Sequence, residues 1–125
     1  MLQDLAYPDL IPAFRELRRV LRPGGRLRLG LPDLDRAIAA YLRGDAAYFH
    51  VPDSDARALG AKLVAQIVWY GSTRTPFTFG FVAELLERAG FVAIERCAFG
   101  ESRDRELAAL DNRPRESLFV EAERP

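Results

Sequence analysis

The sequence has one cysteine, Cys97, one histidine, His50, and one lysine, Lys62, among 125 residues. A lone cysteine forms neither a disulfide nor a cysteine metal cluster within one chain, so we expect no metal site and a cytoplasmic protein. No apolar run approaches the roughly 18 residues that span a bilayer, and the first residues lack the pattern of a signal peptide. Eighteen basic residues balance eighteen acidic ones, which argues against a nucleic-acid or membrane partner.

The length and the 49% hydrophobic content suit a single globular domain that spans residues 1–125. Neither an internal repeat nor a low-complexity stretch interrupts the chain. Residues 45–76 have the least regular pattern and carry many aromatic side chains, so we interpret them as a helical insertion within that domain.

Residues 9–33 read as a helix, a tight turn and a strand. Apolar residues recur at intervals of three and four, as on one face of a helix: Leu10, Phe14, Leu17 and Leu21. Asp9 is placed to cap this helix. Pro23 ends it, the pair Gly24-Gly25 permits a left-handed turn, and the alternation of Leu27, Leu29 and Leu31 then predicts a strand.

The remaining pattern predicts four helices and two strands. Asp33 would cap a helix at 34–42, and Thr78 would cap another that ends at Gly90. The other predicted elements are a helix at about 54–69 within the insertion, a strand at 91–98, a short helix at 102–111 closed by Asn112-Arg113-Pro114, and a strand at 116–121.

Four segments together resemble the later part of a class I S-adenosylmethionine-dependent methyltransferase. They are RVLRPGG at 19–25, FVAELLERAGF at 81–91, SLFVEA at 117–122 and the opening MLQDLAYPDL. The resemblance covers nearly the whole chain. It implies an α/β, partial Rossmann-like fold in which flanking helices cover a small three-stranded mixed sheet. The strand order would be first, third, second, with the last strand antiparallel and central.

The same resemblance implies that the cofactor-binding part of the family is missing. Relatives bind S-adenosylmethionine with a glycine-rich turn after the first strand and an acidic residue at the end of the second, whereas Gly24-Gly25 precedes a strand. We therefore expect a truncated methyltransferase that binds no cofactor alone. Its full-length relatives methylate small-molecule or sugar acceptors. Whether this chain is active by itself stays open, as does the alternative that Met1 is an internal start.

A strand at 26–31 without its usual neighbour would leave one edge of the sheet bare. This predicts a homodimer, or a partner that supplies the missing half. The alternative function is therefore a non-enzymatic dimerisation or interaction module that pairs through this edge. Arg26 and Arg28 fall on one side of the strand, so we expect that face to be only partly buried.

No catalytic residue is assigned, but several side chains are candidates for binding. By resemblance, Gln3 and Asp4 would flank the transferred methyl group of the cofactor; the alternative is that the terminus is frayed. Asp33 would by the same resemblance face the acceptor; the alternative is that it only caps a helix. His50 would be a general base, or only a surface or packing histidine. Trp69, Tyr70 and Arg74 would bind a polar acceptor, with Arg74 on a carboxylate or phosphate, or would form a small aromatic core.

Overall fold

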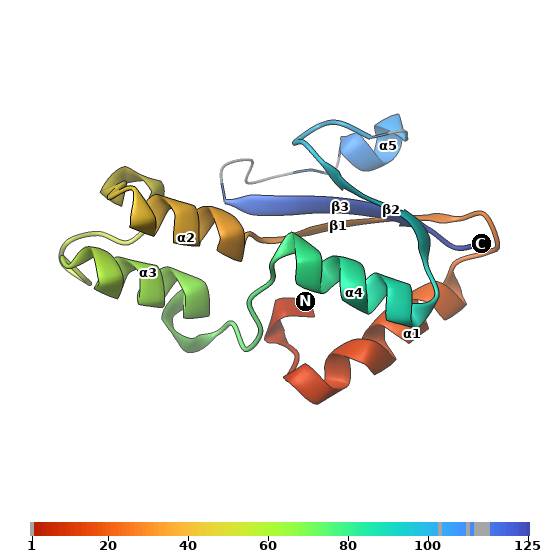
Figure 1. Ribbon diagram of the computed structural model, residues 1–125, viewed down its shortest axis with the longest axis horizontal. Helices are drawn as coiled ribbons and strands as arrows, with labels where there is room; N and C mark the ends of the chain where they lie inside the picture. Colours follow the sequence, from red (N-terminus) through yellow and green to blue (C-terminus); the bar gives the residue numbers. More distant parts are fainter. Residues whose placement is uncertain (1, 103, 110, 112–115) are drawn as a thin grey trace.

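The computed structural model describes residues 2–102, 104–109, 111 and 116–125, and it has an α/β architecture in which helices flank one small sheet (Figure 1). The elements in chain order are the 3₁₀ turns η1 (Leu2–Asp4) and η2 (Tyr7–Asp9), α1 (Leu10–Val20), β1 (Arg26–Pro32), α2 (Leu34–Leu42), η3 (Ala46–Tyr48), α3 (Leu59–Val68), η4 (Trp69–Gly71), α4 (Phe79–Ala89), β2 (Val92–Cys97), α5 (Arg105–Ala108) and β3 (Ser117–Glu123). The predicted closing turn at 112–114 lies outside the described residues.

The sheet has the order β1-β3-β2, so the last strand lies in the middle and runs antiparallel to both neighbours. The predicted strand order is therefore confirmed. The prediction of a mixed sheet is wrong, because β1 and β2 point the same way but never pair with each other. Strand β2 is irregular near Ala93, whose φ is +52°, and its register with β3 shifts there.

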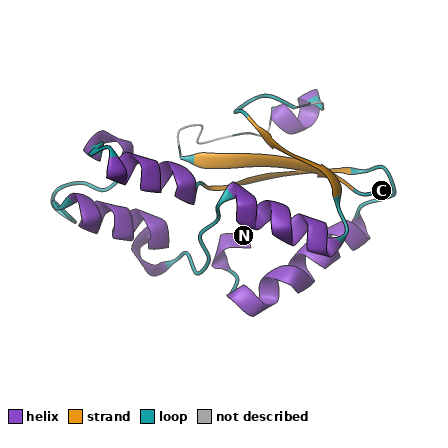
Figure 2. Ribbon diagram, in the orientation of Figure 1, coloured by secondary structure: helices purple, strands orange, loops and turns teal. Residues whose placement is uncertain are grey.

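The main core lies between the sheet and helices α1 and α4, which cover the same face (Figure 2). Its most buried large side chains are Leu10, Phe14, Phe77, Val82, Leu86, Leu118 and Val120. Alternate residues of β1 and β3 point into this core, as the period of two requires. Helix α5 lies on the opposite face of the sheet (Figure 1).

Helix α1 buries Leu10 and Phe14 of the predicted stripe, whereas Leu17 is only partly buried and Leu21 follows the helix. The helix begins without the predicted cap. Asp9 holds the N-cap position, yet its side chain accepts no capping hydrogen bond, so that prediction is wrong. The turn η2 runs directly into the helix, and the Leu10 N–H donates to the Tyr7 carbonyl. This local bond satisfies an amide that a side-chain cap would otherwise serve.

The turn between α1 and β1 requires its two glycines. Gly24 has a φ of +81°, and a Cβ on Gly25 would lie 2.9 Å from the Arg22 carbonyl oxygen. The Gly24 N–H donates to the Arg124 carbonyl at 2.8 Å, and the Gly25 N–H donates to the Arg22 carbonyl at 2.9 Å. Both glycine amides are therefore used in closing the turn and the end of the sheet.

The insertion forms a second, smaller core against α2. Ala37, Ala40, Tyr48 and Phe49 are buried there. Helix α3 begins at Leu59 and not near Ser54, so the predicted start is wrong by about one turn. The buried Lys62 fixes the preceding loop, because its Nζ donates to the Val51 carbonyl and to Asp53 Oδ1, both at 2.7 Å.

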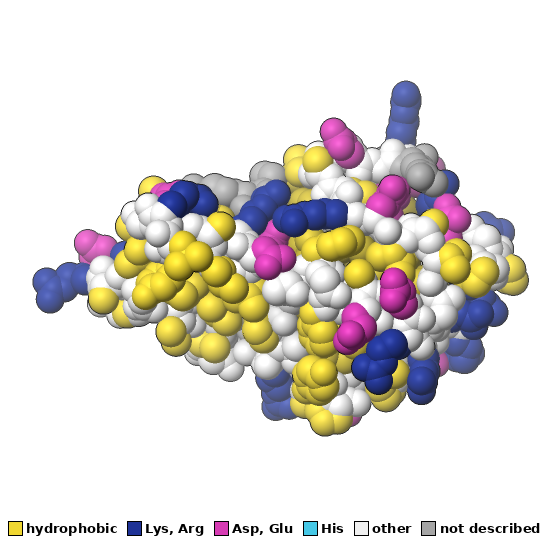
Figure 3. All heavy atoms as spheres, viewed as in Figure 1, with side chains coloured by type: hydrophobic (Ala, Val, Ile, Leu, Met, Phe, Trp, Pro, Cys, Tyr) yellow, Lys and Arg dark blue, Asp and Glu magenta, His cyan; other side chains and the backbone are white. Residues whose placement is uncertain are grey.

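Helices α2 and α3 expose apolar side chains on their outer surface. Figure 3 shows hydrophobic side chains gathered over these two helices. The exposed residues are Ile38, Tyr41 and Leu42 on α2 and Val64 and Val68 on α3. Apolar patches of this kind often mark contact surfaces. Across the described ranges, no helix is both long and apolar enough to cross a membrane.

Candidate functional site

A cavity of about 120 Å³ opens beyond the carboxyl end of β1, where open α/β sheets usually bind ligands. Four parts of the chain line it: the N-terminal turn with Gln3 and Asp4, the start of α2 with Asp33, the insertion with Tyr48, Gln66 and Trp69, and Glu116 before β3. Of the seven predicted binding residues, the cavity brings together Gln3, Asp4, Asp33 and Trp69.

The N-terminal turn is held in place by the segment that leads to α4. The N–H groups of Arg74 and Thr75 both donate to the Gln3 carbonyl, at 2.8 and 3.0 Å. The Thr75 hydroxyl donates to the Leu5 carbonyl at 2.8 Å. These hydrogen bonds argue against a frayed backbone at Gln3. Gln3 Oε1 is buried without a hydrogen-bond partner in the described structure.

Asp33 caps α2 and also binds an arginine. Its Oδ1 accepts a hydrogen bond from the Arg36 N–H at 3.2 Å, which confirms the predicted cap. Its Oδ2 accepts from Arg96 Nη2 at 2.7 Å and lies 3.5 Å from Arg36 Nε. The carboxylate is fully buried and compensated by two cations, so it is not a free base.

The two contacts of Asp33 predict a graded loss of stability. Asp33→Asn keeps an oxygen for the cap and should lower the free energy of unfolding by about 1 kcal/mol, whereas Asp33→Ala removes both contacts and should cost about 2–3 kcal/mol. Urea unfolding measures both values. Asp9→Ala is the matched control, because that aspartate caps nothing, and it should stay within about 0.5 kcal/mol. An Asp33→Ala protein as stable as the parent would contradict the structural role.

His50 lies beside the cavity and pairs with one of its carboxylates. Its Nε2 is 3.2 Å from Glu116 Oε2, and its backbone N–H donates to Gln66 Oε1 at 2.7 Å. The imidazole is partly exposed, so it can exchange a proton with solvent. A histidine held by a carboxylate can act as a general base, which leaves the predicted role chemically feasible.

Trp69 and Tyr70 form a strained pair after α3. Both have left-handed backbones, with φ of +45° and +56°, a conformation that costs about 1–3 kcal/mol for a residue with a side chain. Trp69 lines the cavity, but Tyr70 points elsewhere and donates its hydroxyl to Asp55 Oδ2 at 2.9 Å. That hydrogen bond raises the pKa of the Tyr70 phenol.

Arg74 also lies outside the cavity. Its exposed side chain borders a separate open hollow with Tyr7, Thr78 and Phe81. Only its backbone contributes to the site, through the hydrogen bond to the Gln3 carbonyl. The cavity therefore lacks the cation that the sequence suggested for binding a carboxylate or phosphate.

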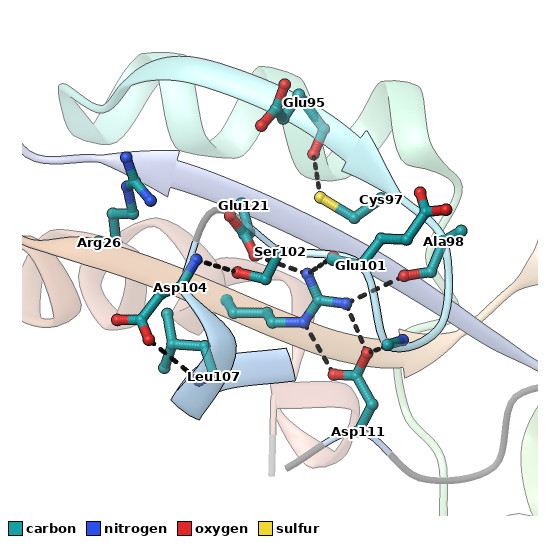
Figure 4. Close-up of polar contacts among 12 residues, drawn as sticks. Arg26, Glu95, Cys97, Ala98, Glu101, Ser102, Asp104, Leu107, Asp111 and Glu121 are labelled. Carbon is teal, nitrogen blue, oxygen red and sulfur yellow. Dashed lines mark hydrogen bonds and ion pairs between the residues drawn. The ribbon is translucent and has the colours of Figure 1, made fainter. Parts of the chain in front are cut away.

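The structure also contains a buried charge cluster that the sequence did not predict (Figure 4). Arg28 donates from Nε to Asp111 Oδ1 at 2.8 Å and from Nη1 to Glu121 Oε2 at 2.6 Å. Arg26 and Arg28 are both partly buried as whole residues, as expected for this face, but the Arg28 side chain is only 4% exposed. Its guanidinium also lies 5.3 Å from the centre of the Phe119 ring. Arg26, two residues away, stays 30% exposed and pairs with Glu123.

Glu95, Cys97 and Glu121 lie close enough together on this face to be considered as metal ligands. Two observations argue against that role. Glu121 is already bound by Arg28. Burial raises the pKa of the Cys97 thiol, which favours the protonated form over the thiolate that binds metals. The cluster is better explained as part of the packing of the sheet.

The Arg28 cluster predicts acid sensitivity. The hydrogen bond from Arg28 holds the pKa of Asp111 below its ordinary value of 3.8. The unfolded chain therefore takes up a proton at higher pH than the folded one, and the stabilisation present at neutral pH is lost as the pH falls below about 4. Unfolding free energies measured between pH 7 and pH 2 should show this loss. In Asp111→Asn the free energy of unfolding should fall less steeply at low pH. An unchanged fall would contradict the role given to Asp111.

The alternation of apolar and polar residues could not have revealed this cluster, because its members are 83 and 93 residues apart in sequence. The one available signal was the pair of arginines in a strand where apolar residues are usual.

Comparison with known proteins found no match to this chain among family models, curated proteins or solved structures.

Proposed function

We propose that this chain forms the acceptor-side part of an S-adenosylmethionine-dependent methyltransferase domain and receives its cofactor pocket from a partner. The observation that carries the proposal is the cavity beyond β1, in which the N-terminal turn meets Asp33 beside a sheet with the order β1-β3-β2. This arrangement agrees with what the resemblance implies for the acceptor side of the family.

The glycine pair supports the need for a partner. A cofactor is commonly bound by free amides of a glycine-rich turn at the start of a helix. The amides of Gly24 and Gly25 instead bond to Arg124 and Arg22, and the turn leads into a strand. The cavity of about 120 Å³ is also small beside the roughly 300–1,000 Å³ of typical ligand clefts.

The chemistry asks little of the side chains of this chain. The sulfonium of the cofactor is already a reactive methyl donor, so the protein contributes mainly proximity and alignment. The cavity would position the acceptor and exclude water. The pair of His50 and Glu116 is the best placed to take up a proton, because Asp33 is compensated by Arg96 and Arg36.

Cofactor binding with and without a partner tests this function. We expect the purified chain alone to show no saturable binding of methyl-labelled S-adenosylmethionine. An affinity-tagged chain recovered from its own host should bring a second protein that binds the labelled cofactor, and the mixture should transfer the label to an acceptor. Tight cofactor binding by the chain alone would overturn the need for a partner. Recovery of a complex that neither binds the cofactor nor transfers the methyl group would overturn the function itself.

A second function, that of an interaction module, is favoured by the open edge of β1. Within the described residues β1 pairs only with β3. The Asp33 N–H donates to the Glu116 carbonyl. In an antiparallel pair, every second residue directs its backbone N–H and C=O toward the neighbouring strand. The backbone groups of Arg26, Arg28 and Gly30 therefore point away from β3. Such an edge can add a strand from another chain. Sedimentation velocity at rising concentration should then show a dimer, whereas a monomer throughout would contradict self-pairing.

A further inference from the structure

The chemical character of the cavity indicates which ligand it accepts. Among the described residues that line it, three are acidic and none is lysine, arginine or histidine. The acidic residues are Asp4, Asp33 and Glu116. Two aromatic residues, Tyr48 and Trp69, complete the lining on the side of the insertion. An anion placed here would meet carboxylates, which repel negative charge.

The side chains that pair with two of these carboxylates lie outside the cavity lining. Arg96 and Arg36 bind Asp33, and His50 binds Glu116. Asp33 is thereby neutralised by two arginines, whereas the group beside Glu116 is an imidazole, which is positive only when protonated, so Glu116 contributes more negative charge to the cavity than Asp33 does. Because the Glu116 side chain is only about a quarter exposed, its charge is less screened by water than a surface charge would be.

One further feature of the lining favours a cationic ligand. Trp69 carries the ring type that attracts cations most strongly. Trp69 directly follows α3 with a φ of +45°, a backbone conformation that is costly for a residue with a side chain.

We propose that the cavity binds an ammonium head group, such as a methylated amine. The volume of about 120 Å³ corresponds to about four water molecules at their liquid density, which matches a head group of a few heavy atoms. The carboxylates of Glu116 and Asp4 attract the charge, and the rings of Tyr48 and Trp69 contact the methyl groups. This inference rests on the proposed function only in making a protonated amine of this kind the methyl acceptor. Its nitrogen must first lose a proton, which the pair of His50 and Glu116 is placed to take up, because only the free lone pair can form the new bond to the methyl group as the bond to the sulfonium breaks. It replaces the earlier expectation that Arg74 would bind a carboxylate or phosphate.

A pair of ligands with the same shape isolates the effect of charge. Choline and 3,3-dimethylbutan-1-ol differ in that a quaternary nitrogen replaces a quaternary carbon. Trp69 is the only tryptophan, so its fluorescence reports binding directly. We expect choline to produce a saturable change and to bind at least about tenfold more tightly than the neutral alcohol. Equal binding of both compounds, or no saturable change with either, would overturn the proposal.

Variants show whether the response comes from this cavity. Glu116→Gln should weaken choline binding by about three- to tenfold, because a facing charge is lost. Glu87→Gln is the matched control, since Glu87 is exposed on α4, and it should leave the affinity unchanged. A Glu116→Gln protein that binds choline as the parent does would also count against the proposal. A circular dichroism spectrum of each variant shows that it is folded.

This experiment and the cofactor experiment fail independently. Choline is titrated into the chain alone, without a methyl donor or a partner, so its binding does not depend on methyl transfer. S-adenosylmethionine, which carries a sulfonium, is titrated separately as a second cation. Saturable binding of choline together with no methyl transfer by any recovered complex would leave the ammonium site standing and remove the methyltransferase function. Methyl transfer to a neutral acceptor without choline binding would support the methyltransferase function and remove the ammonium site.

Discussion

Replacing Arg28 by methionine is expected to lower the free energy of unfolding by about 3–5 kcal/mol. Methionine fills the space of the aliphatic stem but leaves Asp111 and Glu121 without their shared cation. Their side chains are 5% and 4% exposed, so water cannot replace the guanidinium. Guanidinium chloride unfolding at pH 7 measures the loss. The loss should shrink as the pH falls, because without Arg28 its hydrogen bond no longer holds the pKa of Asp111 below the ordinary value.

Two comparisons separate the buried charge from the arginine itself. Arg26→Met, on the same face of β1, breaks a pair with Glu123 that is about 30% exposed and should cost about 1 kcal/mol or less. Adding Asp111→Asn and Glu121→Gln to Arg28→Met should recover much of the loss, because no charge is then buried alone. Equal effects at positions 26 and 28 would show that the burial of the cluster does not matter.

Replacing Phe77 by alanine is expected to cost about 3–5 kcal/mol, through lost apolar burial and the cavity left behind. Phe77 is 0% exposed and stacks on Phe81 with ring centres 5.7 Å apart. Its carbonyl also accepts a hydrogen bond from the Leu34 N–H at 2.9 Å, which joins the end of the insertion to the start of α2. Thermal and denaturant unfolding should both report the loss.

Phe99→Ala provides the control for Phe77→Ala. The Phe99 ring is 47% exposed and makes an edge contact with Phe119 at 5.8 Å, so its removal should cost about 1 kcal/mol or less. Phe77→Leu should fall between the two, because leucine refills part of the space. A Phe77→Ala protein that unfolds like Phe99→Ala would mean that the Phe77 ring contributes no more to the main core than an exposed ring does.

The candidate site was only partly predictable. Asp33 was expected either as a helix cap or, by resemblance, facing an acceptor. The structure confirms the cap and also places Asp33 on the cavity wall, where Arg96 and Arg36 compensate its charge. Trp69 and Tyr70 are adjacent in sequence, yet only Trp69 lines the cavity. The direction of a side chain after a helix depends on backbone angles that composition does not reveal, and here both residues adopt positive φ.

The sequence by itself determined the elements whose cause is local. The leucine spacing set the buried face of α1, Thr78 and Gly90 bounded α4, and Gly24-Gly25 placed the turn before β1. Each depends on interactions within a few residues, which a period or a cap residue records. The order of the strands was inferred from resemblance, because no local pattern specifies a partner about ninety residues away.

Only the tertiary structure decided which charges are buried and what the cavity presents to a ligand. Arg28 reads as a surface residue until Asp111 and Glu121 are brought to it from the far end of the chain. Glu116 reads as an ordinary exposed charge until the fold places it on the cavity wall beside His50. The physical reason is that Coulomb energy and desolvation depend on distance and surroundings in space, and the order of residues along the chain records neither.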